Sequence, residues 1–305
     1  MNQTIAVIGL GAMGFAMAKR LAQRQHRVVG FDIRPEPVAA LEAAGGHGAR
    51  SAADAARGAD VVILMVLNAD QVDHVLFEAG VVAAMRPGAT IVCMATCAPA
   101  RVVASAGRVA EAGIQFIDAP VSGGVAGVEA GTLTIMAAAP RATFEAAEAL
   151  LREIGTNTHF LGEDIGRGAA MKTVNQLLAG VHIVAAAEAL ALAEREGIDT
   201  QLALEILSNS AASSWMLRDR GPRMVADPES AIEVRSAIDI FVKDLGIVTD
   251  TGRASRFGLP LATTALQLYV SASGAGLGRA DDSQVIEQYR RANGTRYRAN
   301  PMKDQ

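Results

Sequence analysis

The stretch Ile5-Ala6-Val7-Ile8-Gly9-Leu10-Gly11-Ala12-Met13-Gly14 lies near the start of the chain. A short apolar run leads directly into a G-x-G-x-x-G pattern, and a helical stretch follows to about Gln23. Glycines at these positions allow a tight turn and the close approach of a pyrophosphate, which binds at the positive N-terminus of a helix. The stretch therefore predicts the first strand, phosphate-binding loop and first helix of a Rossmann domain.

An acidic residue follows the second predicted strand, Val28–Phe31. This residue, Asp32, can accept hydrogen bonds from a ribose 2′-hydroxyl, and its charge would repel a 2′-phosphate. The pattern favours NAD, although Arg34 leaves NADP open as an alternative. The predicted cofactor-binding residues from these two segments are Gly9, Leu10, Gly11, Ala12, Met13, Gly14 and Asp32.

Strand and helix patterns alternate through the first half of the chain, which is typical of a parallel sheet with helices on both faces. Further strands are predicted at Val61–Val66, Thr90–Met94, Phe116–Asp118, Thr132–Ala137 and Thr158–Leu161. Helices are predicted from Pro35, over Ala98–Ala112 and over Phe144–Ile154.

Strand signals stop after Gly166, and long helical patterns follow. They cover Gly168–Glu196, Thr200–Ser208, Ser236–Arg256, Pro260–Ser273 and Asp282–Arg290. The sequence thus predicts a doubly wound α/β Rossmann domain over residues 1–163, an all-α domain over residues 164–295, and a polar tail at 296–305.

The composition is that of a globular chain of 305 residues, half of them hydrophobic, with a formal net charge of −4. That charge argues against a nucleic-acid partner. The two cysteines, Cys93 and Cys97, and five scattered histidines predict neither a disulfide framework nor a metal site, and a reducing cytoplasm fits. No signal peptide is expected, and the apolar run Leu177–Ala193 is interpreted as a buried helix, so no membrane partner is expected.

A second glycine-rich segment, Asp118–Gly124, lies at the end of a predicted strand, where ligands of open α/β sheets collect. Its Ser122, Gly123 and Gly124 offer one hydroxyl and exposed backbone N–H groups, which suit a carboxylate. A plain loop is an equally good interpretation of these residues alone.

Lys172 and Asn175 lie one helical turn apart, on one face of the first long helix of the second half. A lysine on a helix is usually only solvated. This one lies near the predicted domain boundary, where clefts form. A partly desolvated lysine beside a positive nicotinamide would have a lowered pKa and could take a hydroxyl proton, while Asn175 orients that hydroxyl.

Four motifs occur in the order found in the β-hydroxyacid dehydrogenases, the family of 3-hydroxyisobutyrate and tartronate semialdehyde dehydrogenases, which is related to 6-phosphogluconate dehydrogenase. They are Gly9–Gly14, Asp118–Gly124 with Gly131–Met136, Gly166–Asn175, and Lys243-Asp244-Leu245. The chain resembles this family over nearly its whole length. The resemblance implies a Rossmann domain followed by an all-helical domain of the 6-phosphogluconate dehydrogenase-like type.

The resemblance also implies roles for individual residues. Lys172 matches the catalytic lysine, and Ser122, Gly123 and Gly124 match the loop that binds the substrate carboxylate. Asn175 matches the amide that orients the substrate, and Gln176, which stands next to it where many members carry a second asparagine, is expected to bind the substrate as well. Further cofactor contacts are implied for Ile33, Val66, Leu67, Thr96 and Lys243.

Within the family, the segments around Leu177–Ile183, Ser214–Met216, Asp239–Gly246 and Asp281–Ser283 resemble the L-threonate dehydrogenase branch. This implies oxidation of a four-carbon aldonate to 2-oxotetronate. Gln176, where many members carry a second asparagine, puts a three- or four-carbon 3-hydroxy acid in doubt, although a dehydrogenase or reductase of the 3-hydroxyisobutyrate or tartronate semialdehyde type stays an alternative. An NADP-linked reductase and a non-enzymatic NAD(P)-binding protein are less favoured, because Asp32 and Lys172 are both present. A homodimer or homotetramer is expected from the family.

Overall fold

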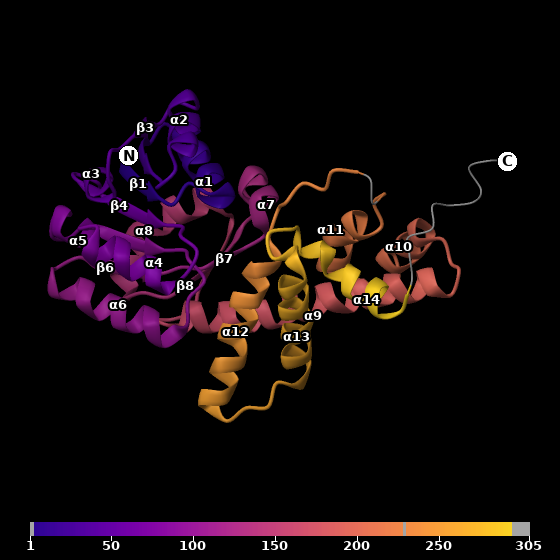
Figure 1. The fold of residues 1–305 in the computed structure, drawn as a ribbon. Coiled ribbons are helices and arrows are strands. Elements are labelled where there is room, and N and C mark those ends of the chain that lie inside the picture. The colour runs from indigo at the N-terminus through magenta and orange to yellow at the C-terminus, as the bar shows by residue number, and fades with distance from the viewer. Residues whose placement is uncertain (1–2, 228–229, 295–305) are drawn as a thin grey trace. The chain divides into compact units, whose positions relative to one another are not determined.

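The computed structural model describes residues 3–227 and 230–294 of the chain (Figure 1). The chain divides into two compact units, Met1–Lys172 and Thr173–Gln305. The first unit is built on strands and the second on helices, as the sequence predicts.

The main sheet of the first unit is parallel throughout, and its strand order is β3-β2-β1-β4-β5-β6. The strands are β1 (Thr4–Ile8), β2 (Arg27–Phe31), β3 (His47–Gly48), β4 (Val61–Leu64), β5 (Thr90–Cys93) and β6 (Gln115–Asp118). Because β1 lies between β2 and β4, the strand order reverses next to it. The loop that follows β1 therefore opens at the switch point where open α/β sheets bind ligands.

Apart from the short, exposed strand β3, the strands of the main sheet contribute side chains to two separate hydrophobic cores, one on each face of the sheet. In β1, Ile5 and Val7 face one core, while Ala6 and Ile8 face the other. In β4, Ile63 and Leu64 divide in the same way. Each large aliphatic side chain buried in this way contributes roughly 1.5–3 kcal/mol. The continuous apolar runs of these strands are explained by burial on both faces.

Helices cover both faces. Those packed on the Ile5 side include α1 (Ala12–Gln23), α2 (Pro35–Ala43) and α8 (Arg141–Ile154). Those on the Ala6 side are α3 (Ala52–Ala56), α4 (Ala69–Asp73), η1 (His74–Glu78), α5 (Val81–Ala84) and α6 (Pro99–Glu111). The short helices α3, α4, η1 and α5 are not among the predicted elements, because runs this short carry no resolvable 3.6-residue period.

The last two predicted strands do not extend the main sheet. They form a second, three-stranded sheet of β7 (Val121–Ser122), β8 (Thr134–Ala137) and β9 (Asn157–Phe160). In this sheet β7 and β8 are antiparallel, whereas β8 and β9 are parallel. The expectation of one parallel sheet was therefore wrong for these strands. A strand–helix alternation does not distinguish one sheet from two when a two-residue strand such as β7 redirects the chain.

The second unit is helical in the residues described. Its helices are α9 (Arg167–Arg195), α10 (Thr200–Ser208), α11 (Trp215–Met224), α12 (Ile238–Ser255), α13 (Pro260–Ala272), η2 (Ser273–Leu277), η3 (Asp282–Val285) and α14 (Ile286–Ala292). Helices α12 and α13 pack side by side (Figure 1). Between them, Phe241 stacks on Tyr269 with ring centroids 5.1 Å apart. The predicted helices are confirmed here, whereas α11 is not among them, because Pro222 and a largely polar sequence obscure its period.

Helix α9 starts in the first unit and continues into the second. The sequence placed the domain boundary at residues 163–164, where the strand signals stop, while the compact units part at Lys172 and Thr173. The first turn of α9 belongs to the first unit because its backbone N–H groups bond to Asp118 of β6. The predicted polar tail, 296–305, lies outside the described residues.

By length and composition alone, α9 is apolar enough to cross a membrane, and half of its most apolar window is buried. Core helices of globular proteins pass the same test, so this is weak evidence for a membrane span. The helix ends at Arg195, two residues before Gly197, which has a φ of 76°, and the N–H of Ile198 donates to the carbonyl oxygen of Ala193 at 2.9 Å.

Candidate functional site

The glycine-rich loop after β1 has a shape that only glycine allows at two positions. Gly9 has a φ of 91°, and a Cβ on it would lie 2.5 Å from the carbonyl oxygen of Met65. A Cβ on Gly14 would lie 1.9 Å from the carbonyl oxygen of Gly9, so helix α1 packs directly against the loop. Gly11, by contrast, faces open space, with no heavy atom of the described residues within 4 Å of its ideal Cβ.

The N-terminus of α1 starts at Gly11, and no side chain of the described residues caps it. The first-turn N–H groups, including those of Ala12 and Met13, are therefore available to an anion. Together with the open space at Gly11, this arrangement fits the pyrophosphate of a dinucleotide.

Asp32 lies just after β2, beside this loop. Its Oδ2 accepts the N–H of Leu10 at 2.8 Å, and its Oδ1 accepts the N–H of Arg34 at 2.9 Å and the Nε of Arg34 at 3.2 Å. Burial raises the pKa of Asp32, but the hydrogen bonds from Arg34 and Leu10 and the charge of Arg34 outweigh burial and hold it below its ordinary value. The carboxylate is therefore ionised at neutral pH. It is connected to the phosphate loop, while the neighbouring Ile33 is 89% exposed.

The other predicted cofactor residues of the first unit follow the next two strands of the sheet. Val66 and Leu67 follow β4, and the N–H of Leu67 donates to Oε1 of Gln71 at 2.8 Å. Thr96 follows β5, between the buried thiols of Cys93 and Cys97. A hydrogen bond that the Cys93 thiol makes to Cys97, together with burial, raises the pKa of Cys93 well above its ordinary value, so this thiol stays protonated.

The predicted carboxylate loop follows β6 and consists of the short strand β7 and two glycines. Gly123 and Gly124 have φ values of 129° and 63°, which explains why both are glycine. Helix α7 (Gly124–Ala130) starts here, although the sequence analysis interpreted the segment as a loop. Ser122 is half-buried at the end of β7 and pairs with Thr134 of β8.

Lys172 lies beside this loop. Its side chain is buried, with only 7% of the residue exposed, and its Nζ donates to the carbonyl oxygen of Val121 at 2.7 Å. Val121 immediately precedes Ser122. The structure therefore brings the predicted catalytic amine and the predicted carboxylate loop together within the first unit.

Asp118 is a buried carboxylate that anchors the helix bearing Lys172. Its Oδ2 accepts the N–H groups of Gly166 at 3.0 Å and Ala169 at 2.9 Å, at the start of α9. A Cβ on Gly168 would lie 2.6 Å from the carbonyl oxygen of Asp118, which accounts for the second glycine of the Gly166–Lys172 motif. Burial raises the pKa of Asp118 to about 6, although the backbone hydrogen bonds oppose this rise.

The sequence analysis gave Asp118 no role of its own. The signal that could have found it is an acid at the end of an apolar strand followed, later in the chain, by a helix start without a capping side chain.

A set of polar contacts within the second unit joins the remaining predicted residues. Nδ2 of Asn175 donates to Oε1 of Gln176 at 2.8 Å, and Nε2 of Gln176 donates to Oδ2 of Asp244. Lys243 donates from Nζ to Oδ1 of the same carboxylate. Asp244 is buried and is a second residue to which the sequence analysis assigned no function.

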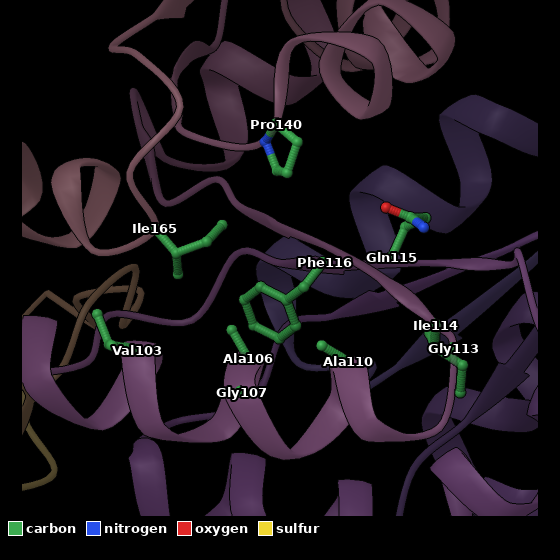
Figure 2. Close-up of a pocket in the computed structure, with 10 residues that line it drawn as sticks. All are labelled: Val103, Ala106, Gly107, Ala110, Gly113, Ile114, Gln115, Phe116, Pro140 and Ile165. Atoms are coloured by element: carbon green, nitrogen blue, oxygen red, sulfur yellow. The ribbon is translucent and has the colours of Figure 1, made fainter.

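Away from these residues, a cavity of about 330 Å³ lies between helix α6 and strand β6. Figure 2 shows the residues that line it. Phe116 points toward Ala106 and Ala110 of α6, and Gln115 is the one amide in an otherwise apolar lining. The lining includes none of the predicted site residues, so the cavity is not assigned to the chemistry of the site. Within residues 3–227 and 230–294, no group of three or more His, Cys, Asp or Glu side chains is arranged to hold a metal ion.

The fold and these residues define a Rossmann-type dehydrogenase: a phosphate loop with an acid after β2, and a buried lysine beside a glycine-rich loop. A sequence profile of the NAD-binding domain of 6-phosphogluconate dehydrogenase matches residues 4–162. A second profile, described as the NAD-binding domain of NADP-dependent 3-hydroxyisobutyrate dehydrogenase, matches residues 166–289. The chain belongs to the 3-hydroxyisobutyrate dehydrogenase-like family, and it is an NAD-dependent hydroxyacid dehydrogenase.

Relatives cover nearly the whole chain. An L-threonate dehydrogenase of Cupriavidus necator is 44% identical over 94% of this chain and 96% of its own length. An L-threonate dehydrogenase of Pectobacterium atrosepticum is 42% identical over 94% of both chains. Among solved structures, a 3-hydroxyisobutyrate dehydrogenase of Salmonella typhimurium has a TM-score of 0.88 at 39% identity, covering 93% of this chain and 99% of that one.

Proposed function

We propose that this enzyme oxidises L-threonate, or a closely similar aldonate, to the 2-oxo acid with NAD. The observation that supports this proposal most directly is the contact between Lys172 and Val121, the residue preceding Ser122. The reaction needs a proton acceptor beside a group that binds the carboxylate, and the proposal assigns these two roles to Lys172 and to the loop that contains Ser122. The identity of 44% to a relative named L-threonate dehydrogenase supports this choice of substrate.

The proposed chemistry assigns one task to each group. Ser122 and the N–H groups of Gly123 and Gly124 hold the substrate carboxylate, which fixes the carbon next to it. Lys172 takes the proton of the reacting hydroxyl as the carbonyl double bond forms, and it returns a proton in the reverse direction. NAD, when bound, supplies the acceptor for the hydride that leaves the same carbon.

The amides after Lys172 complete the proposed site. Asn175, one turn further along α9, contacts a substrate hydroxyl, and Gln176 supports it. Gly9–Gly14 and Asp32 hold the dinucleotide, with further contacts from Ile33, Val66, Leu67, Thr96 and Lys243. The pairing of Arg34 with Asp32 favours NAD over NADP, because it uses the guanidinium that would otherwise attract a 2′-phosphate.

The test is NADH formation by the purified protein with a panel of acids: L-threonate, D-threonate, both erythronates, 3-hydroxyisobutyrate and glycerate, each with NAD and with NADP. Selective turnover of L-threonate with NAD is the expected result. Turnover restricted to 3-hydroxyisobutyrate and glycerate would mean that the substrate is a branched or three-carbon acid rather than an aldonate, and it would leave the role proposed for Lys172 intact.

We also propose a cytoplasmic homodimer or homotetramer without nucleic-acid or membrane partners. Its support is the net charge of −4 and a set of exposed apolar side chains on α9, namely Val174 at 53%, Leu178 at 50% and Leu192 at 59%. Such side chains are typical of surfaces that a second chain covers. Light scattering coupled to size exclusion measures the oligomer, and a monomer at micromolar concentration would contradict this part of the proposal.

A further inference from the structure

A relay of hydrogen bonds runs through the second unit from Lys243 to Asn175. The carboxylate of Asp244 accepts from Lys243 on one oxygen and from Gln176 on the other. Gln176 in turn accepts from Asn175 at 2.8 Å. Gln176 and Asp244 are only 7% and 3% exposed, so water does not compete for these contacts.

The chemistry of the groups sets the direction of the relay. A carboxylate that receives two donors offers only acceptors, so Gln176 must turn its NH₂ group toward Asp244. The carbonyl oxygen of Gln176 then faces Asn175, and Asn175 must turn its own NH₂ group toward it. The Oδ1 of Asn175 is left pointing out of the relay, where it accepts no hydrogen bond from the described residues.

We infer that Asp244 is a positioning residue, which fixes the amide of Asn175 so that its oxygen accepts a hydrogen bond from a substrate hydroxyl. The inference rests on the proposed function and deepens it. The carbonyl group that forms at the oxidised carbon of the substrate has no proton to donate. The oxygen of Asn175, which can only accept, therefore suits a hydroxyl on the neighbouring carbon, because that hydroxyl is unchanged by the reaction. An aldonate carries such a hydroxyl, whereas 3-hydroxyisobutyrate does not.

Asp244→Asn tests the inference because it reverses the relay. Lys243 then donates to the new amide oxygen, the new NH₂ group turns toward Gln176, and Gln176 flips. Asn175 is then forced to present its NH₂ group to the substrate. We expect kcat/KM for the aldonate to fall about tenfold or more, the loss typical of a misplaced buried polar contact.

The second substitution, Asn175→Asp, restores an acceptor in the reversed relay, because one carboxylate oxygen accepts from Gln176 and the other from the substrate. The variant Asp244→Asn/Asn175→Asp is therefore expected to exceed the Asp244→Asn variant in kcat/KM by roughly threefold or more. If Asp244 only stabilises the fold, the double variant will be no better than the single one, and that result overturns the inference.

Asp250→Asn, an exposed acid on the same helix, is the matched control and should leave kcat/KM unchanged. KM for NAD is measured separately, since Lys243 also contacts Asp244. A wild-type protein that turns over none of the acids overturns the proposed function, and the inference falls with it. An active wild-type protein whose double variant shows no recovery overturns the inference alone.

If the Asp244→Asn variant does not fold, two substitutions at Gln176 distinguish the positioning role from a packing role. Gln176→Glu keeps an acceptor toward Asn175, whereas Gln176→Met fills the volume without one. The relay predicts that Gln176→Glu retains the higher kcat/KM of the two. A packing role predicts the opposite order, because the buried charge would then only destabilise the protein.

Discussion

The side-chain nitrogen of Lys172 lies 2.7 Å from the carbonyl oxygen of Val121. This single contact joins α9 to the strand that leads into Ser122. The distance between the amine and the glycine-rich loop is therefore set by the backbone of β7 rather than by a flexible side chain of the loop.

Replacing Lys172 by methionine should abolish most of the activity while keeping the buried volume filled. We expect kcat to fall about 10²- to 10⁴-fold, because a positioned general base contributes that much. Steady-state kinetics with the best acid of the panel measures the loss, and fluorescence titration with NADH checks that cofactor binding persists. Retention of kcat in the variant would mean that another group handles the proton.

Substitutions at two glycines of the phosphate loop should have different effects, one on the stability of the fold and the other on cofactor binding. Gly14→Ala places a methyl group on the backbone of Gly9, so we expect a loss of about 1–3 kcal/mol in the free energy of unfolding. Gly11→Ala enters open space at a φ of −61° and should change that free energy by about 1 kcal/mol or less. We expect it instead to weaken NAD binding, because the methyl group occupies the space that fits the pyrophosphate. Denaturant titrations and NADH titrations on the two variants distinguish these effects, and equal losses of stability would contradict the assignment.

Asp32→Ser should shift the cofactor preference toward NADP. Removal of the carboxylate abolishes its hydrogen bonds to the ribose and releases the guanidinium of Arg34 to meet a 2′-phosphate. We expect kcat/KM for NAD to fall by about tenfold, the loss of a charged hydrogen bond, and the ratio of NADP to NAD to rise by more than that. An unchanged ratio would show that the ribose lies away from Asp32.

The raised pKa of Asp118 makes the stability of the protein depend on pH. Because the folded-state value is about 6 and the ordinary value is 3.8, the folded state holds this proton at pH values where the unfolded state has released it. The contribution of Asp118 to stability is thus fully present below the ordinary pKa and is lost as pH rises through about 6. The loss is on the order of 2–3 kcal/mol.

Asp118→Asn removes this titration and keeps an oxygen for the N–H groups of α9. The free energy of unfolding is measured at a series of pH values from about 4 to about 7, a range that contains the shifted pKa of Asp118. The wild type should lose stability relative to the variant as the pH rises. Asp250→Asn, at an exposed ion pair, should show no such trend. Parallel pH profiles for the wild type and Asp118→Asn would contradict the burial of an ionised carboxylate here.

The local pattern was sufficient to predict the Rossmann half and the long helices. The apolar runs of β1, β4 and β5 are buried on both faces of the sheet. Helices α9, α12 and α13 are long enough for a helical hydrophobic repeat to be recognised in their sequences. The second sheet could not be predicted, because β7 has only two residues, too few to show an alternating pattern, and helix α7 separates it in the sequence from its antiparallel partner β8. The short helices between β3 and β5 are fixed by packing on the sheet and not by their own sequences.

For the candidate site, the sequence pattern singles out residues that have a distinct chemistry of their own, such as Lys172 and Asp32, and their roles stay predictions. The residues without a predicted role, Asp118 and Asp244, act through other groups. Asp118 bonds to backbone N–H groups far along the chain, and Asp244 bonds to a glutamine on another helix. Contacts of this kind depend on the folded arrangement and leave no spacing in the sequence.

The end of β6 has a wider consequence. Asp118 pairs with Ala138 of the segment after β8, and its carboxylate also holds the first turn of α9. Strand β7 leaves the same point three residues later. The positions of the Lys172 side chain and of the loop at Ser122–Gly124 therefore both depend on the end of β6. A displacement of that strand end would move the two together.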